Sequence, residues 1–395
     1  MLAIDFLKEQ HVKNFIQDNV LADVNKLILN PPAGFSEHIK DISNQIKSRQ
    51  KAKNKLKDWS TNFELIMPPP ISIEQASSKV TSEYKKTILS GQHLVDLTGG
   101  MGIDCVSLSD AFEHTTYVER QAELCEIFKH NMQVLGKTIN VVNDTAENYL
   151  KTFKTKSDQT IAYLDPARRD DAQKKVFKIE NCSPDLKSMM PLLKKTCSEV
   201  LIKFSPLLDI KSVLETLSYV ETVHVVSVKN ECKELLIMID FAFDGEPGIK
   251  CVNLETEHPN YDFAYTEEKE AKVSYSEPKA YIYEPNSSIM KAGAFRKICL
   301  DYELDKFGQH THLYTSNWLS HDFPGRVYKV TEQLNKLNLR KYAPEGKINV
   351  VTRNYPLRPD ELKRKWKLKD GGDYFVLAFR DHKDKTHQLI ATRVD

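Results

Sequence analysis

Short apolar runs alternate with amphipathic stretches between residues 93 and 240. The runs are HLVDL, TTYVE, INVVN, TIAYLD, VLIKFS, VETVHVVSV and ELLIMIDFAF. Strands that alternate with helices are typical of a doubly wound, mainly parallel sheet. Only residues 229–233 separate the last two runs, which is too short for a crossover helix. This pair therefore predicts an antiparallel hairpin at the end of the sheet.

The flanking segments follow other patterns. Up to about residue 66, apolar residues such as Phe6, Val12 and Phe15 lie at helical spacing, and three prolines at 68–70 stop any helix. Beyond about residue 245 the alternation ends, and a helical segment precedes a strand-rich tail. The expected parts are a helical N-terminal domain (1–70), a sheet domain (71–245), a linking region (246–323) and a C-terminal domain (324–395).

The composition excludes several classes of protein. Lys and Arg number 56 and Asp and Glu 55, so the chain of 395 residues is not a polycation that finds nucleic acid by bulk charge. No apolar run approaches the roughly 20 residues that cross a bilayer, and no signal-peptide core is present, so we expect a cytoplasmic protein without membrane contact. The seven cysteines form no CxxC pair and the histidines lack ligand spacing, which predicts neither disulfides nor a metal site.

The neutral total conceals a basic segment. Between Lys336 and Lys369, 11 basic residues face 3 acids, and three aromatic residues lie among them. Cations mixed with aromatic rings are typical of phosphate contact combined with base stacking, although a solvated surface is the competing interpretation. The residues predicted to contact RNA are Lys341, Arg353, Arg358, Lys363, Arg364, Lys365 and Lys367.

The most informative stretch is LVDLTGGMGID, residues 94–104. A strand that ends in an acid and runs into a glycine-rich turn lets a ligand approach the backbone, because glycine lacks a Cβ atom. A P-loop would need a Gly-Lys-Ser/Thr that is absent, and Cys105 occupies the third glycine position of the dinucleotide motif. What remains is a class I S-adenosylmethionine site, in competition with a merely structural turn. Its predicted cofactor contacts are Asp96, Thr98, Gly99, Gly100, Gly102 and Asp104.

Three later strands also end in acids. Glu119 and Arg120 are predicted cofactor contacts, and Glu119 is placed to accept hydrogen bonds from both ribose hydroxyls of a nucleoside. Asp144 and Ala146 are also predicted cofactor contacts. Asp144 is placed for the adenine amino group, and helix N-capping is its competing role. Asp165 closes the fourth strand and precedes a proline, in the order and at the distance from the glycine turn expected of such a site.

The ordered motifs DLTGGMGID, YVE, ND and DPARR resemble those of class I methyltransferases over roughly residues 72–240. The whole chain, with IEQASS, NCSPD, IKFSPLLDI, EPNSSIMKAGAF and RNYPLRPDELKRKWKLKDGGDYFVLAF, is similar to bacterial class I methyltransferases with a C-terminal THUMP-like domain. The resemblance implies an α/β fold: a Rossmann-like, seven-stranded core, a helical N-terminal domain and an α+β, ferredoxin-like and THUMP-like C-terminal region. It also implies S-adenosyl-L-methionine as cofactor and RNA, either tRNA or rRNA, as substrate.

Asp165, Pro166 and Arg168 are the predicted catalytic residues. In amino-group methyltransferases of RNA and DNA, an Asp or Asn before Pro-Pro-aromatic accepts hydrogen bonds from the target amine. Here Ala167-Arg168 replaces Pro-aromatic, so the Arg168 plane would stack on the base or hold a phosphate. The prediction is methylation of a base nitrogen in structured RNA. Two alternatives stay open: an RNA-binding protein that retains the fold, and a methyltransferase of a protein or small molecule.

The end of the fifth strand argues against carbon methylation. The uridine C5 methyltransferases carry a nucleophilic Cys before a Pro there, whereas this chain has Ser205-Pro206. A covalent adduct to carbon needs a thiolate. Lys203, two residues earlier, is expected to reach a phosphate or solvent. Ser77 is expected to close over the methionine end of the cofactor or to pack beside a helix.

Overall fold

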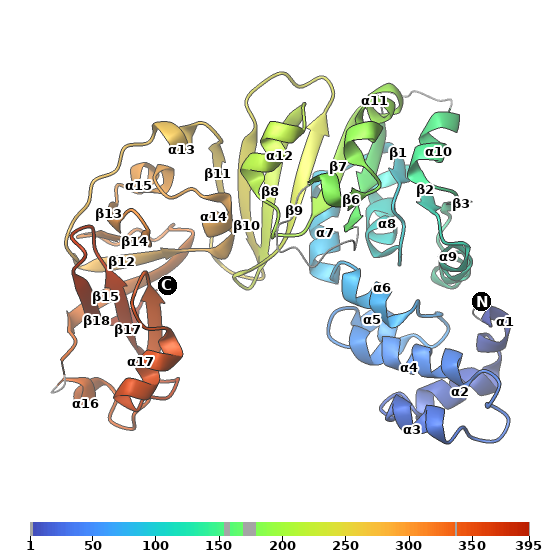
Figure 1. Ribbon diagram of the computed structural model, residues 1–395, viewed down its shortest axis with the longest axis horizontal. Coiled ribbons are helices and arrows are strands. Elements are labelled where there is room, and N and C mark those ends of the chain that lie inside the picture. The colour runs from blue at the N-terminus through green and yellow to red at the C-terminus, as the bar shows by residue number, and fades with distance from the viewer. Residues whose placement is uncertain (1–2, 154–158, 169–178, 336–337, 395) are drawn as a thin grey trace. The chain divides into compact units, whose positions relative to one another are not determined.

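The computed structural model describes residues 3–153, 159–168, 179–335 and 338–394. The chain forms two compact units (Figure 1). The first unit comprises Met1–Val220 and Leu236–Phe243, and the second comprises Glu221–Leu235 and Asp244–Asp395.

Helices form the N-terminal part of the first unit, as the apolar spacing predicts. Leu7, Val12 and Ile16 pack in one cluster with Leu124 and Ile127 of a later helix, α9. Burial of this apolar stripe holds short helices that would be marginal in isolation. The helices are α1 (Ile4–Leu7), α2 (Gln10–Asp18), α3 (Val24–Leu29), α4 (Ile39–Ala52), α5 (Lys57–Thr61) and α6 (Pro70–Gln75).

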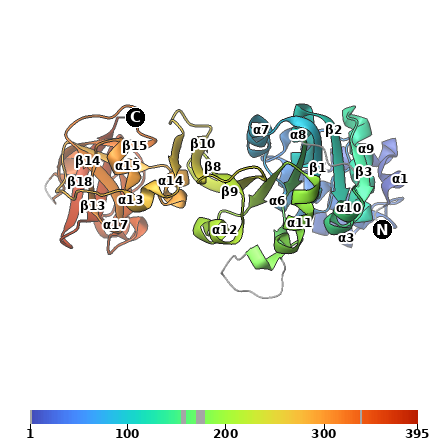
Figure 2. The ribbon, with the colours of Figure 1, turned by 90° about the horizontal axis from the view of Figure 1, so that it is seen from above.

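The rest of the first unit is a parallel sheet with helices on both faces. Figure 2 shows α7 and α8 on one face of the strands and α10 and α11 on the other. All five residues of β4 are buried, as expected for a strand covered on both faces. The parallel strands are β1 (Gly91–Asp96), β2 (Phe112–Glu119), β3 (Asn140–Asn143), β4 (Thr160–Leu164) and β7 (Glu199–Phe204). The helices are α7 (Lys79–Ile88), α8 (Ile103–Leu108), α9 (Ala122–Leu135), α10 (Ala146–Thr152), α11 (Leu186–Thr196) and α12 (Ile210–Thr216), with 3-10 turns η1 (Ser109–Ala111) and η2 (Ile179–Asn181).

The sheet has nine strands, in the order β11-β10-β8-β9-β7-β4-β1-β2-β3. A two-residue turn, Lys229-Asn230, joins β8 (Val220–Val228) to β9 (Glu231–Asp240), and both turn residues have positive φ as such a tight turn requires. The prediction that this hairpin ends the sheet is wrong, because β10 (Gly248–Leu254) pairs parallel with β8 and β11 (Tyr261–Ala264) pairs with β10. Two strands thus extend the expected seven-stranded core.

A second sheet, of seven strands, lies in the second unit in the order β13-β14-β12-β15-β18-β17-β16. Its core contains Ile282, Phe307, Tyr328, Leu377 and Phe379, all fully buried. The strands are β12 (Tyr281–Pro285), β13 (Asp305–Gly308), β14 (Thr311–Ser316), β15 (Gly325–Gln333), β16 (Asn349–Arg353), β17 (Tyr374–Arg380) and β18 (Thr386–Arg393). The helices are α13 (Glu267–Glu270), α14 (Ser287–Ala292), α15 (Lys297–Asp301), α16 (Leu339–Tyr342) and α17 (Pro359–Trp366).

Among the described residues, no helix combines the length and the apolar character that a bilayer span needs. The seven cysteines are all free thiols in this structure.

Candidate functional site

The glycine-rich turn leads from β1 into α8. A Cβ atom on Gly99 would come within 2.2 Å of the Tyr117 ring, and one on Gly102 within 2.2 Å of the Phe128 ring. The two rings are buried and stack with their centroids 3.9 Å apart. A side chain at either glycine would displace this pair, and Gly102 also has a φ of +85°, in the left-handed region, so packing and backbone conformation account for these two glycines without a ligand.

Gly100 has a different environment. Its φ of +53° lies in the left-handed region, and a Cβ atom there would meet only the carbonyl oxygen of Thr98, at 3.6 Å. The space over Gly100 is therefore open. Its N–H donates to a carboxylate oxygen of Glu119 at 3.0 Å. A ligand can approach the backbone at this glycine, as a cofactor turn requires.

Glu119 ends β2 and is 8% exposed. Besides the Gly100 N–H, its carboxylate accepts the Gln121 N–H at 2.8 Å. Two backbone donors fix the plane of the carboxylate, and each oxygen keeps acceptor capacity for a further donor. Arg120, the next residue, is exposed.

Asp144 follows β3. Its N–H donates to the Glu119 carbonyl at 3.2 Å, and its carboxylate accepts the Thr145 N–H at 2.7 Å. The N-cap of α10 is Thr145, whose hydroxyl accepts the Asn148 N–H, so Asp144 is not the helix cap. Ala146 is buried in the first turn of α10.

Asp96 lies beneath the turn. The residue is 1% exposed, and its carboxylate accepts the Thr98 N–H at 3.0 Å. Burial raises the pKa of Asp96 well above its ordinary value of 3.8, although the Thr98 hydrogen bond opposes that shift. The side chain braces the turn from inside the sheet.

Asp165 follows β4, and its N–H donates to the Thr98 hydroxyl at 2.6 Å. This bond ties the acid to the glycine turn, while 37% of the Asp165 side chain stays exposed. Pro166 is buried and Ala167 is exposed. Arg168 pairs with Cys182 in the ribbon β5 (Ala167–Arg168) and β6 (Cys182–Ser183), and its side chain lies outside the described residues.

The parallel topology thus gathers the predicted polar groups. Thr98, Gly100, Glu119, Asp144 and Asp165 all stand at the carboxyl ends of adjacent strands. Hydrogen bonds join Asp165 to Thr98, and Glu119 to both Gly100 and Asp144, while Thr98 and Gly100 belong to the same turn. Ligands of open α/β sheets bind at this edge.

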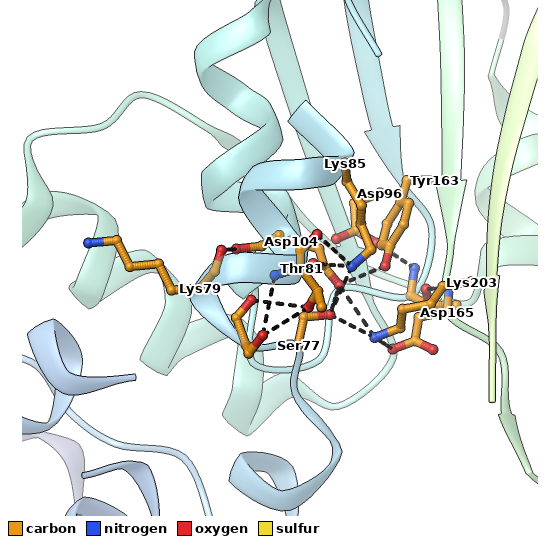
Figure 3. Close-up of polar contacts among 12 residues, drawn as sticks. Ser77, Lys79, Thr81, Lys85, Asp96, Asp104, Tyr163, Asp165 and Lys203 are labelled. Atoms are coloured by element: carbon orange, nitrogen blue, oxygen red, sulfur yellow. Dashed lines mark hydrogen bonds and ion pairs between the residues drawn. The ribbon is translucent and has the colours of Figure 1, made fainter. Parts of the chain in front are cut away.

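A group of charged and hydroxyl side chains, most of them buried, lies beside this edge, and we call it the ion cluster: Ser77, Lys85, Asp104, Tyr163, Asp165 and Lys203 (Figure 3). Asp104 Oδ2 accepts hydrogen bonds from Ser77 at 2.7 Å and Tyr163 at 2.6 Å. Lys85 lies 3.2 Å from Asp104 Oδ1, and Lys203 lies 3.4 Å from Oδ2.

The ion cluster sets the charge of Asp104. Burial alone would favour the neutral acid. The charges of Lys85 and Lys203 and the hydrogen bonds from Ser77 and Tyr163 outweigh that effect and lower the pKa of Asp104. Asp104 is predicted to contact the cofactor, and the structure places its carboxylate among these four groups.

Sequence reasoning missed part of the ion cluster. Lys85 and Tyr163 are not singled out by any motif, and Lys203 is expected at a phosphate or in solvent. The structure instead buries the Lys203 side chain to 9% exposure, with Asp165 Oδ2 at 2.5 Å. The one available signal is local: Lys85 stands four residues after Thr81, on the face of α7 that is buried.

Acidic residues of the second unit pair with some of the cations of its basic segment. Arg353 pairs with the buried Glu284, Lys341 with Glu332 at 3.5 Å, and Lys363 with two aspartates at 2.8 and 2.9 Å. The remaining predicted RNA contacts are all exposed: Arg358, Arg364, Lys365 and Lys367.

The aromatic residues of that segment pack inward. Tyr342 is 7% exposed within a core cluster, and Tyr355 and Trp366 pack against the same cluster. Leu362 anchors α17 there at 1% exposure. The rings stabilise the fold of this part, so the structure gives no support to base stacking on Tyr342.

Among the described residues, one group has the geometry to hold a metal ion: Glu277, Asp381 and His387. His387 Nε2 lies 2.7 Å from Asp381 Oδ2, and Lys385 lies 3.5 Å from Glu277. Internal ion pairs account for the group, which is far along the chain from the glycine turn.

Comparisons with known proteins match three parts of the chain to family models. Residues 72–189 match "Conserved hypothetical protein 95", residues 281–324 a ferredoxin-like domain, and residues 325–393 a THUMP domain-like family. No curated protein matches the chain.

A solved structure with nearly full-length coverage is among the matches. It is a candidate methyltransferase from Porphyromonas gingivalis W83, 30% identical, covering 98% of each chain with a TM-score of 0.87. An rRNA methylase from Streptococcus thermophilus is 16% identical over 40% of this chain and 93% of its own, with a TM-score of 0.30. A candidate methyltransferase from Streptococcus mutans in complex with SAH is 14% identical over 41% and 96%, with a TM-score of 0.31. The last two are too distant to carry an argument about this chain.

Proposed function

The chain belongs to the family of bacterial class I methyltransferases with a C-terminal THUMP-like domain, and from that premise we propose that it methylates a base nitrogen in structured RNA, tRNA or rRNA. Its cofactor is S-adenosyl-L-methionine. When bound, the cofactor supplies a methyl group on a sulfonium: the S–C bond breaks as the N–C bond forms, and the nitrogen loses a proton to solvent.

The residues at the strand ends fit this cofactor. The open backbone at Gly100 admits a ligand, and the oriented carboxylate of Glu119 is an acceptor suited to vicinal ribose hydroxyls. Asp144 offers a carboxylate for the adenine amino group. In the proposal these three residues hold the nucleoside part, and Gly99, Gly102 and Asp96 shape the turn behind it.

The observation that carries the proposed reaction is the position of Asp165. Its backbone is hydrogen-bonded to Thr98 of the glycine turn, and its carboxylate is partly exposed at the carboxyl end of β4. A protein accelerates methyl transfer chiefly by holding the nucleophile close to the methyl group and in line with it. We assign Asp165 to accept a hydrogen bond from the target amine, with Pro166 fixing the loop.

The RNA substrate is supported by the second unit. Residues 325–393 match a THUMP domain-like family, and Arg358, Arg364, Lys365 and Lys367 present exposed cations there. Phosphate contacts supply most of the sequence-independent affinity for nucleic acid. Arg168 stays a proposed contact to the base or a phosphate.

The test is transfer of labelled methyl from S-adenosylmethionine into total small RNA from a strain that lacks this protein. We expect label in RNA with the unchanged protein and a loss of at least about 100-fold with Asp165→Ala, because the acceptor for the amine is gone. Cofactor affinity, measured by calorimetry, should stay within about threefold in the variant because Gly100 and Glu119 are intact.

The other outcomes identify the alternatives. Tight cofactor binding without labelled RNA would point to a protein or small molecule as methyl acceptor. Absence of cofactor binding together with RNA binding would point to an RNA-binding module that retains the fold. A loss of cofactor affinity in Asp165→Ala as large as that in Gly100→Arg would contradict the role of Asp165.

A further inference from the structure

Lys203 connects the ion cluster to the proposed methyl-transfer site (Figure 3). Its Nζ lies 2.5 Å from Asp165 Oδ2, 2.9 Å from the Ser77 hydroxyl and 3.4 Å from Asp104 Oδ2. The Lys203 side chain is 9% exposed, whereas that of Asp165 is 37% exposed. One ammonium group thus bridges a buried acid and an accessible one.

The backbone dictates this approach. Strands β4 and β7 are parallel neighbours with Leu164 opposite Ile202, so the next residues, Asp165 and Lys203, lie side by side. Adjacent positions of parallel strands carry their side chains on the same face of the sheet. The contact follows from register and does not depend on a flexible loop.

Lys203 contributes to the charge balance of Asp104, but that role does not account for its position. Asp104 already has Lys85 at 3.2 Å from Oδ1, and Ser77 and Tyr163 donate to Oδ2. Lys203 lies nearer to Asp165 than to Asp104, at 2.5 against 3.4 Å. Of these two lysines, Lys203 alone has a contact with Asp165 in the ion pairs of the described residues.

We infer that Lys203 is a positioning residue for methyl transfer, acting through Asp165. The Asp165 N–H is tied to Thr98 and its Oδ2 to Lys203, which fixes the plane of the carboxylate and directs Oδ1 to the target amine. A supporting shell of this kind holds a reacting group within the narrow limits that catalysis needs. This inference rests on the proposed function of Asp165.

The test compares Lys203→Met with Lys85→Met in the full-length protein. Both changes remove one buried ammonium next to Asp104 and keep an unbranched side chain of similar length, so both disturb the ion cluster. Only the first removes a contact with Asp165. The readouts are kcat and KM for methyl transfer to small RNA at saturating cofactor, cofactor affinity by calorimetry, and the folded fraction by circular dichroism.

We expect Lys203→Met to lower kcat about 10- to 100-fold per folded molecule, with KM and cofactor affinity within about threefold. Lys85→Met should keep kcat within about threefold, and Lys203→Arg, which retains the charge, should recover part of the loss. Lys203→Met should add little to the defect of Asp165→Asn, because both changes affect one interaction.

Three results would overturn the inference. Equal losses of kcat in Lys203→Met and Lys85→Met would show a merely structural role. A full additional loss in the Asp165→Asn background would show that Lys203 acts independently of Asp165. Absence of transfer by the unchanged protein would reject the proposed function itself, and this inference with it, whereas the first two results leave the proposed function standing.

Discussion

The two units hold their predicted functional residues in opposite ways. In the first unit, residues from four separate motifs meet at one edge of a sheet, where hydrogen bonds of 2.6–3.2 Å join Asp165 to Thr98 of the glycine turn, and Glu119 to both Gly100 and Asp144. In the second unit, some basic residues of one continuous segment pair with acids, as Lys341, Arg353 and Lys363 do, whereas others form no ion pair among the described residues. The sheet topology therefore brings distant residues together into one site, whereas basic residues that are neighbours in the sequence do not form one common surface.

The physical cause of this difference is the parallel sheet. Its connections return every strand in the same direction, so the strand ends converge whatever their sequence separation. A stretch of basic residues has no such constraint. For example, Arg353 pairs with Glu284, which lies 69 residues earlier in the chain, on β12.

The largest expected effect tests how strongly the first unit depends on its buried charges. Asp104→Asn should destabilise this unit by about 3–5 kcal/mol at pH 7, because Lys85 loses its carboxylate partner inside the protein. The folded state lowers the pKa of Asp104, so its stabilisation is complete above the ordinary pKa of 3.8 and is lost as the pH falls below that value. Hydrogen exchange at the amides of β1 and β4, followed from pH 7 to pH 3, measures both the loss of stability and its dependence on pH.

Asp96→Asn is the matched control, since it also neutralises a buried acid of the same sheet. Burial raises the pKa of Asp96, so the contribution of this acid is most favourable below 3.8 and declines as the pH rises toward the folded pKa. Relative to the unchanged protein, the Asp96→Asn variant should therefore gain stability with rising pH, while Asp104→Asn loses it. Identical pH trends in the two variants would contradict this account of the ion cluster.

The next effect tests whether the gathered strand ends form one binding site. Glu119→Gln places an amide N–H₂ against the backbone donors of Gly100 or Gln121 and removes the charged acceptor. Hydrogen bonds to charged groups contribute about 1.5–3 kcal/mol, so the Kd for S-adenosylmethionine should rise about 10- to 100-fold in calorimetry. Glu126→Gln on the exposed face of α9 is the control, and an equal change in Kd there would reject the site.

These comparisons show which features the sequence contains and which it does not. Glycine turns, strand ends and helical apolar spacing are local patterns, and the order of the parallel strands converts them into a site. The contact of Lys203 with Ser77 joins residues 126 positions apart and depends on strand register and side-chain direction, for which the sequence offers no pattern. The extension of the sheet by β10 and β11 is also hidden, because the sequences of these strands, GIKCVNL and YDFA, contain no long apolar run.

The smallest expected effect concerns RNA binding by the second unit. It tests whether a lysine that is paired with an acid contributes less to RNA binding than a lysine without such a pair. Lys365→Gln and Lys367→Gln remove exposed charges at the end of α17, so each should lower the salt slope of RNA binding by about 1 and the affinity a few-fold. Lys341→Gln and Lys363→Gln should change the slope less, because those charges already face acids within 3.5 Å.

Filter binding to total tRNA at several salt concentrations measures both pairs of variants on equal terms. Equal slopes for the two pairs would show that RNA phosphates displace the internal acids, since surface ion pairs are weak enough to exchange partners. The ion pairs that distinguish the basic segment of the second unit would then exist only in the protein without RNA. A larger loss of salt slope and affinity for Lys365→Gln and Lys367→Gln would instead mean that RNA phosphates bind the cations of α17 as the free protein presents them, without displacing any acid.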